Sequence, residues 1–320
     1  MRKWVSLVLP LVGLVIFVWI VRGTGLSRVL DTFRRIDPKS LAVFPVFTVF
    51  ILWIRGYRWW ILMRLVGIPY TRRRSSIVWA IGFFAASITP GKVGDAVRAL
   101  YVSRETGRGL GESFLTVFMD RLMDLVVVLV FGVATILVFS YRYTDMPSIW
   151  VIVAASVAAL GLVYLVLNRS LMRALAGPFF RALTPKKYRT QLSTQVHGFY
   201  DALALYAGRW KSTAFAFFLT LVFWAGIVLL AYTATRVLEI DVSFGYVALM
   251  MPMVTLVEIV PISISGIGTR EAAVIFFFAA VGIGSAQAVA FSIMYLMAGT
   301  YLTALVGFLA WLANPAKLNE

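Results

Sequence analysis

The sequence contains no cysteine and a single histidine, His197, among its 320 residues. Disulfides, thiolate chemistry, iron–sulfur clusters and sites with several histidine ligands are therefore excluded or nearly so. Charged residues are also scarce, at 14%, whereas hydrophobic residues make up 61% of the chain and the mean hydropathy is +0.89. Such a composition leaves too little polar surface to cover a water-soluble domain. We therefore expect an all-α integral membrane protein without a metal or a cofactor.

Acidic residues are few as well, with 14 Asp and Glu against 30 Lys and Arg, which gives a formal net charge of +16. In a soluble protein this excess would suggest a nucleic-acid partner, but here the basic residues lie beside apolar runs. Lys and Arg in such places attract anionic headgroups and set the orientation of the spans. As partners we expect an anionic membrane lipid and no nucleic acid, and we keep a second copy of the chain and a separate lipid-modifying enzyme as candidates.

Apolar runs of about 20 residues are long enough to cross the hydrocarbon of a bilayer. The full-length runs are residues 4–21, 41–63, 113–139, 148–168, 212–235 and 286–313. We interpret the first as a retained span rather than a signal peptide, because no small-residue cleavage site follows it. Three further runs are too short or too interrupted to cross, and these are residues 75–89, 244–260 and 272–284.

Basic residues flank the short run 75–89 on both sides, and both flanks therefore favour the cytoplasm. A re-entrant hairpin that turns at Pro90 and Gly91 satisfies this double preference. The basic loop 169–211 and both termini are also predicted to be cytoplasmic, in the cell membrane of a prokaryote. The loop 22–40 is an exception, because the span count places it outside although it is rich in arginine.

With this topology the single transmembrane domain, residues 1–320, divides into two similar halves. Residues 1–141 give two spans, a hairpin and a span, and residues 148–313 give the same order in the opposite orientation after a short external loop. Inverted repeats of this kind are typical of transporters, whose broken elements meet near the midplane and form the binding site. The alternative is that two glycine-rich turns resemble each other by chance.

Two turns rich in Ser, Pro and Gly, at residues 87–98 and 261–271, are each followed at once by opposite charges. Irregular backbone and ionised side chains at membrane depth need surrounding protein or water. We therefore predict a substrate site there, in which Arg98 and Arg270 face each other and each lies within reach of a carboxylate. The candidate binding residues are Arg98, Arg270, Lys92, Asp95, Glu271, Arg55, Gly91, Gly94, Gly266 and Gly268.

The glycines allow tight turns, and their N–H groups at a helix start are free to receive a phosphate unless these are simply packing glycines. Arg55 lies about 13 Å along the helix axis from Arg64, too deep to reach the interface easily, so we expect a buried partner or site for it. Arg58 stands among aromatic residues, and we favour an arginine that extends to the membrane interface.

The carboxylates allow two interpretations, as ion pairs that hold the fold together or as groups that act on a substrate. For Asp120, Arg121 and Asp124 we favour structural ion pairs, with Arg121 three residues before Asp124. The candidates for proton exchange are Glu258, Asp95 and Glu271, and of these Glu258 stands alone in an apolar run.

Three stretches occur in a fixed order along the chain: residues 90–98 (PGKVGDAVR), residues 120–124 (DRLMD) and residues 265–272 (SGIGTREA). Together they resemble the signatures of the lysylphosphatidylglycerol synthase/flippase transmembrane-region family, which includes flippase-like domains and UPF0104-type membrane proteins. The resemblance implies a relative of the domain that moves aminoacylated phosphatidylglycerol between leaflets, and other relatives are implicated in handling polyprenyl-phosphate sugars. Asp95 replaces the glutamate that is more frequent in the family. No aminoacyl-transferase domain follows residue 313, so we expect no synthase activity.

A phosphate that crosses hydrocarbon needs cationic groups and a wet cavity in place of its hydration, and arginine supplies a bidentate, permanently charged partner. We therefore predict a transporter rather than an enzyme, a flippase-like protein for an anionic phospholipid or a polyprenyl-phosphate-linked lipid. Two alternatives remain open. They are a secondary transporter of a small anion, and a membrane enzyme or subunit of lipid glycosylation, although the sequence contains no acidic metal-binding cluster.

Overall fold

The computed structural model describes residues 15–34, 36–143, 199–259 and 266–314, together with isolated positions between 154 and 174. These residues form helices joined by short turns, and no strand occurs among them. Three apolar helical stretches are long enough to cross a membrane, at Pro38–Leu65, Trp210–Val237 and Ser285–Ala313. They confirm the helical membrane class and coincide with the predicted spans 41–63, 212–235 and 286–313. Most of the predicted span 148–168 and the start of the span 4–21 lie outside the described residues.

The first half of the chain contains helices on both sides of a tight turn. Its elements are α2 (Leu26–Arg34), η1 (Pro38–Val43), α3 (Phe44–Leu65), α4 (Arg72–Ser87), η2 (Pro90–Ala96), α5 (Val97–Thr106) and α6 (Leu110–Tyr143). Thr71 fixes the start of α4, because its side chain accepts a hydrogen bond from the backbone N–H of Arg74. Gly107, with φ of 68°, ends α5 in the left-handed conformation.

The second half follows the same order of long and short helices. Its elements are α10 (Trp210–Val237), α11 (Phe244–Ile259), α12 (Thr269–Ala279), α13 (Ser285–Tyr295), the π-helical η3 (Leu296–Tyr301) and α14 (Leu302–Ala313). The last three form one continuous helical stretch. Residues 260–265, which include the start of the second predicted turn, lie outside the described residues.

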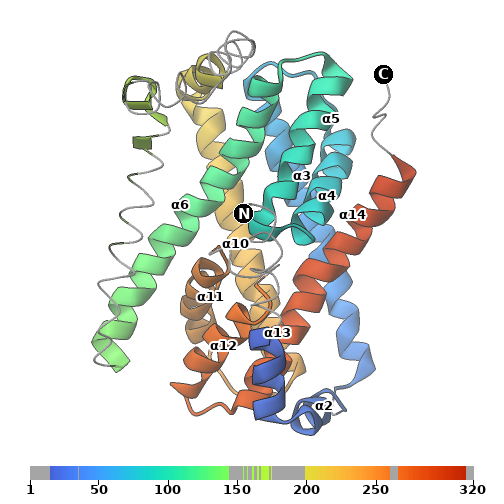
Figure 1. Cartoon of the computed structure of the whole chain (residues 1–320), viewed down its shortest axis with the longest axis vertical. Coiled ribbons are helices and arrows are strands. Elements are labelled where there is room, and N and C mark those ends of the chain that lie inside the picture. The colour runs from blue at the N-terminus through green and yellow to red at the C-terminus, as the bar shows by residue number, and fades with distance from the viewer. Residues whose placement is uncertain are drawn as a thin grey trace.

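The short apolar runs of the sequence form short helices, and these helices lie in two pairs, α4 with α5 and α11 with α12. Figure 1 shows α4 and α5 in the upper half of the molecule and α11 and α12 in the lower half. With 16 residues α4 is about 24 Å long, and α12 with 11 residues is about 16 Å long, so each is shorter than the roughly 30 Å of hydrocarbon.

The long helices pack across the two halves in a matching way. Helix α6 contacts α5 of its own half and α11 of the other, while the stretch α13 to α14 contacts α12 of its own half and α4 of the other. Helices α3 and α10 contact each other between these groups. The packing of α14 on α4 is especially close, because a Cβ atom at Gly307 would lie 2.1 Å from the carbonyl oxygen of Ala80.

Candidate functional site

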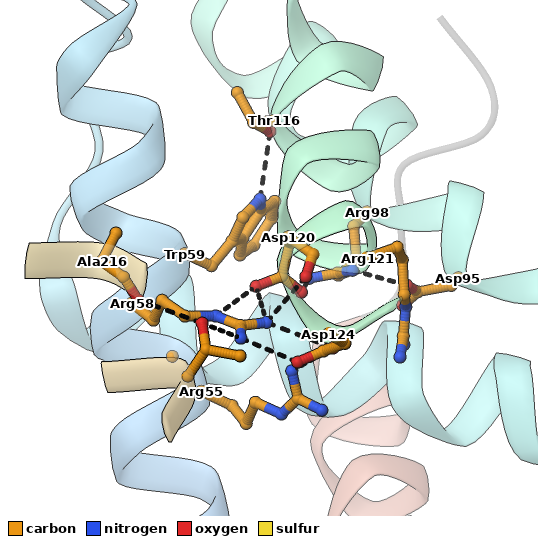
Figure 2. A network of polar contacts seen from close by, with 12 residues as sticks. Arg55, Arg58, Trp59, Asp95, Arg98, Thr116, Asp120, Arg121, Asp124 and Ala216 are labelled. Atoms are coloured by element: carbon orange, nitrogen blue, oxygen red, sulfur yellow. Dashed lines mark hydrogen bonds and ion pairs between the residues drawn. The ribbon is translucent and has the colours of Figure 1, made fainter. Parts of the chain in front are cut away.

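An arginine of α3 and two carboxylates of α6 form the centre of a buried charged network (Figure 2). The Nε atom of Arg58 lies 2.9 Å from Oδ1 of Asp120, and its Nη1 atom lies 2.8 Å from Oδ1 of Asp124. The same Nη1 donates a hydrogen bond of 2.8 Å to Oγ1 of Thr220 on α10. Because Asp120 and Asp124 are four residues apart, they share one face of α6. Arg58 therefore joins α3, α6 and α10 through their polar side chains.

The expectation that Arg58 reaches the membrane interface is wrong, since its exposed fraction is 0%. Arg58 follows Arg55 by three residues, and the face of α3 that they share packs inward. Arg55 confirms the expectation of a buried partner, because it pairs with Asp124 and its guanidinium carbon lies 3.7 Å from the ring centroid of Phe223. The aromatic neighbours of Arg58 in sequence misled the prediction, and the three-residue spacing of the two arginines was the better signal.

The first turn is anchored to this network by Arg98, the second residue of α5. Its Nη2 atom lies 2.5 Å from Oδ2 of Asp95 in η2, and its Nη1 atom lies 3.1 Å from Oδ2 of Asp120. Gly82 of α4 makes room for this side chain, because a Cβ atom there would lie 2.3 Å from Cγ of Arg98. Asp120 therefore holds both Arg58 and Arg98.

Arg121 points toward the first turn, where its Nε atom lies 2.5 Å from Oδ2 of Asp95. The predicted local pair of Arg121 with Asp124 is wrong, because Arg121 pairs with Asp95 of the first turn while Asp124 pairs with Arg55 and Arg58 of α3. The prediction that these charges form ion pairs is confirmed, although their partners lie on other elements. The Arg121 side chain is 31% exposed, so solvent reaches this edge of the network.

The second turn contains a smaller charged group. Arg270, the second residue of α12, pairs with Glu258 of α11, so Glu258 is not the isolated acid that the sequence suggested. Both Arg98 and Arg270 thus confirm the expectation of a carboxylate partner. Glu271 accepts hydrogen bonds of 2.5 Å from the N–H of Gly268 and 2.6 Å from Oγ of Ser292, which fixes the start of α12 against α13.

The candidate glycines serve packing and capping. A Cβ atom at Gly94 would lie 2.2 Å from the carbonyl oxygen of Ala85, and one at Gly266 would lie 2.8 Å from Cγ of Glu258. The expectation of free N–H groups at these glycines is wrong in two cases, because Gly94 donates to Thr89 and Gly268 donates to Glu271. Gly91 lies in η2 at the tip of the first hairpin. The hydroxyl of Thr89 and the carboxylate of Glu271 thus already accept hydrogen bonds from these two N–H groups.

Lys92 lies at the tip of the first hairpin, where its backbone is left-handed with φ of 57°. Its side chain is reached by solvent, and Glu258 and Arg270 of the second hairpin are near enough to act on its charge. The neighbouring Ile88 and Val93 are 58% and 72% exposed. Side chains at the tip of the first hairpin are therefore accessible rather than enclosed by the packed helices.

Across both turns the cations outnumber the acids. The cations are Arg55, Arg58, Arg98, Arg121, Arg270 and Lys92, and the acids are Asp95, Asp120, Asp124, Glu258 and Glu271. The formal charge of this group is therefore +1. Three of its buried polar atoms, Nε of Arg55, Nε of Arg98 and Oδ1 of Asp95, have no hydrogen-bond partner in the described part of the chain, which leaves polar capacity for a ligand or water. Among the described residues no three His, Cys, Asp or Glu side chains are placed to hold a metal ion.

Comparison with known proteins identifies relatives along the whole chain. The UPF0104 membrane proteins of Methanocaldococcus jannaschii and Pyrococcus horikoshii are each 22% identical to it, over 98% and 99% of this chain and 96% and 99% of theirs. One from Methanothermobacter thermautotrophicus is 24% identical over 97% of this chain. The family described as the lysylphosphatidylglycerol synthase TM region matches residues 5–307. The chain therefore belongs to the lysylphosphatidylglycerol synthase transmembrane-region family.

Proposed function

We propose that this protein moves an anionic lipid, a phospholipid or a polyprenyl-phosphate-linked lipid, between the two leaflets of the membrane without covalent chemistry. The observation that supports the proposal most strongly is the charged group at the two turns, with its formal charge of +1. An excess positive charge at this depth is costly unless an anion or water balances it. The phosphate of a lipid headgroup is a suitable anion, and its acyl chains stay in the surrounding hydrocarbon.

The accessible cations bind the phosphate of the lipid first. Arg121 is 31% exposed and Lys92 is reached by solvent, whereas Arg58 and Arg98 are fully buried among carboxylates. The phosphate competes with Asp95 for the guanidinium of Arg121, and Asp95 takes Arg121 back when the lipid leaves. This exchange keeps the affinity moderate, which release to the second leaflet requires.

Arg270 and Glu258 repeat the arrangement at the second hairpin. Lys92, near both groups, is placed to pass the phosphate from one to the other. The paired contacts of the long helices support an inverted repeat, because α6 packs on α11 as α14 packs on α4. In such a repeat the two short-helix hairpins enter from opposite sides of the membrane, and the site lies where their tips approach.

We further propose the cell membrane of a prokaryote as the location, with the termini and the 65–74 loop in the cytoplasm. Figure 1 places the start of α4 and the helix α2 at opposite ends of the molecule, as this topology requires. Of the two basic loops, the loop before α4 is the one that we place in the cytoplasm, because the basic end of α5 lies on the same side of the membrane. The aspartates near α2 make contacts only with nearby residues in the sequence. Asp31 pairs with Arg34 at 3.0 Å, and Asp37 caps the start of η1.

The direct test is movement of fluorescent phosphatidylglycerol in proteoliposomes. The wild-type protein should move it, and the double variant Arg121→Gln/Lys92→Gln should lose most of this movement, since both accessible cations are gone. Arg34→Gln is the control for an exposed arginine far from the hairpins. Arg98→Ala and Arg270→Ala should also abolish movement, with folding checked by size-exclusion chromatography.

Two results would contradict the proposal. If the wild-type protein moves none of the anionic lipids tested but transports a water-soluble anion, the small-anion transporter is the correct function. If Arg121→Gln/Lys92→Gln moves lipid at the wild-type rate, the assignment of the accessible cations is wrong.

A further inference from the structure

A groove separate from the charged core lies between α3 and α4, near the end where α4 begins. Its volume is about 400 Å³, and it is lined by Trp53, Tyr57, Arg72, Arg73 and Ser76. The α3 residues of this groove lie outside the inward face that holds Arg55 and Arg58, and Trp53 is 61% exposed. The groove is therefore open to whatever surrounds the protein at this level.

Aromatic rings form a stacked row along the α3 side of the groove. The ring centroids of Trp53 and Tyr57 lie 6.0 Å apart with planes 9° from parallel, and those of Tyr57 and Trp60 lie 5.6 Å apart at 18°. The spacing of four and three residues places the rings on one side of the helix. Trp60 is held in place by a hydrogen bond of 2.9 Å from its Nε1 to the carbonyl oxygen of Tyr70. The row is a preformed apolar surface with polar edges.

Three consecutive arginines begin α4, and only the third has a carboxylate partner in the part of the chain that the structure describes. Arg74 pairs with Glu105 at 2.5 Å and donates to Oδ1 of Asn314 at 2.7 Å, so it links α4 to α5 and to the end of α14. Arg72 instead lies over the aromatic row, with its guanidinium carbon 4.5 Å from the ring centroid of Trp60. Arg73 lines the groove beside it.

The arginines and the aromatic row together favour a ligand that has both an anionic group and an apolar part. The two exposed arginines and the positive end of the α4 helix dipole attract a phosphate. The aromatic row next to them belongs to a helix apolar enough to span the membrane, so its exposed rings lie against lipid at the interface. A small soluble anion would use the arginines but would leave the aromatic row without a function.

We propose that this groove binds one anionic phospholipid of the adjoining leaflet. The phosphate lies between Arg72 and Arg73, and the glycerol and upper acyl chain lie along Trp53 and Tyr57. Ser76 also lines the groove, and its hydroxyl donates a hydrogen bond to the carbonyl oxygen of Arg72. The site does not depend on transport, because no residue of the charged core contributes to it.

Native mass spectrometry of the detergent-purified protein with added phosphatidylglycerol tests the site. The wild-type protein should bind phosphatidylglycerol in preference to phosphatidylcholine. Arg72→Gln/Arg73→Gln should weaken the first binding event at least about tenfold, the loss expected when charge-assisted hydrogen bonds to a phosphate are removed. Arg22→Gln/Arg28→Gln removes the same charge from exposed positions elsewhere and should leave this binding event unchanged.

The aromatic row has its own matched pair of variants. Trp53→Leu should weaken the binding of phosphatidylglycerol, whereas Trp210→Leu, at a similarly exposed tryptophan with 65% exposure, should not. The proposal is overturned if both arginine pairs have equal effects, if phosphatidylcholine binds equally well, or if millimolar inorganic phosphate displaces the lipid. The last result would assign the groove to a soluble anion.

Discussion

Arg58 pairs with two buried carboxylates in the core of the helices. It is fully buried, and it donates hydrogen bonds to Asp120, Asp124 and Thr220. Removing one member of a buried ion pair leaves an uncompensated charge, which costs more than the net stabilisation that the pair supplies. The stability of the helix core should therefore depend strongly on this one side chain.

Arg58→Ala should lower the free energy of unfolding by about 3–5 kcal/mol, because Asp120 and Asp124 each lose a buried cationic partner. Arg58→Lys should be intermediate, since it retains the charge but not the planar fork. Thermal unfolding in detergent measures both variants. Arg64→Ala on the same helix is exposed and serves as the control. Equal melting temperatures for Arg58→Ala and Arg64→Ala would contradict the role assigned to Arg58.

Glu105, near the end of α5, gives the protein a pH-dependent contact outside the spans. Partial burial opposes its ionisation, but hydrogen bonds from Arg74 and Tyr70 outweigh this effect and lower the pKa of the carboxyl below its ordinary value of 4.5. A lowered folded-state pKa means that the contribution to stability is complete above the unfolded pKa and is lost as the pH falls through the folded value.

The wild-type protein should therefore lose thermal stability as the pH falls below about 4.5, the unfolded pKa of a glutamate. Glu105→Gln should lose stability at neutral pH and show a flatter dependence over the acidic range. Melting temperatures of both proteins from neutral pH to pH about 3.5 check this difference. Parallel curves would show that the contact contributes nothing to the pH dependence.

Residue-level predictions succeeded where the residues lie close together in the sequence. The pair of Asp95 and Arg98, three residues apart, and the buried position of Arg55 follow from local geometry and depth. The pairing of Arg121 with Asp95 and of Glu258 with Arg270 does not, because it depends on how distant helices pack. Asp120 and Asp124 have a spacing of four residues that indicates a shared helix face, but the sequence does not show which helix that face meets.

At the scale of elements, the short runs of the sequence correspond to short helices in the structure. The run 75–89 is part of α4, which begins earlier, at Arg72, because Thr71 caps it there. The run 244–260 corresponds to α11, and the run 272–284 overlaps α12, which begins at Thr269. Hydropathy alone predicted starts for α4 and α12 that are too late, because polar and charged residues form the first turn of each helix.

The hairpin of α4, η2 and α5 should have both ends on the cytoplasmic side. The chain has no native cysteine, so single cysteines can be labelled selectively. In intact cells a membrane-impermeant maleimide should label Asp241→Cys, in the short loop before α11, and should label Thr106→Cys only after permeabilisation. Labelling of Thr106→Cys from outside would show that this segment crosses the membrane, and the inverted repeat would then be lost.

At the scale of the whole molecule, composition alone identified a helical membrane protein, and three motifs in order identified its family. The matching contacts of the two halves could not be predicted, because they depend on interfaces such as that of Gly307 with Ala80, where small residues allow helices to approach. The same packing brings Lys92 near Glu258 and Arg270, although the three residues lie far apart in sequence. The proposed site is therefore a property of the assembled helices rather than of one motif.

The most direct test of this account is whether a lipid headgroup enters the charged core. Phosphatidylglycerol with a diazirine next to its headgroup would be photo-cross-linked to the protein in proteoliposomes, and the attachment sites would be mapped by mass spectrometry. We expect attachment at the first hairpin tip, residues 88–93, and loss of this attachment in Arg121→Gln/Lys92→Gln with the groove between α3 and α4 still labelled. Attachment confined to the outer surfaces of the helices, with none at residues 88–93 in the wild-type protein, would contradict it.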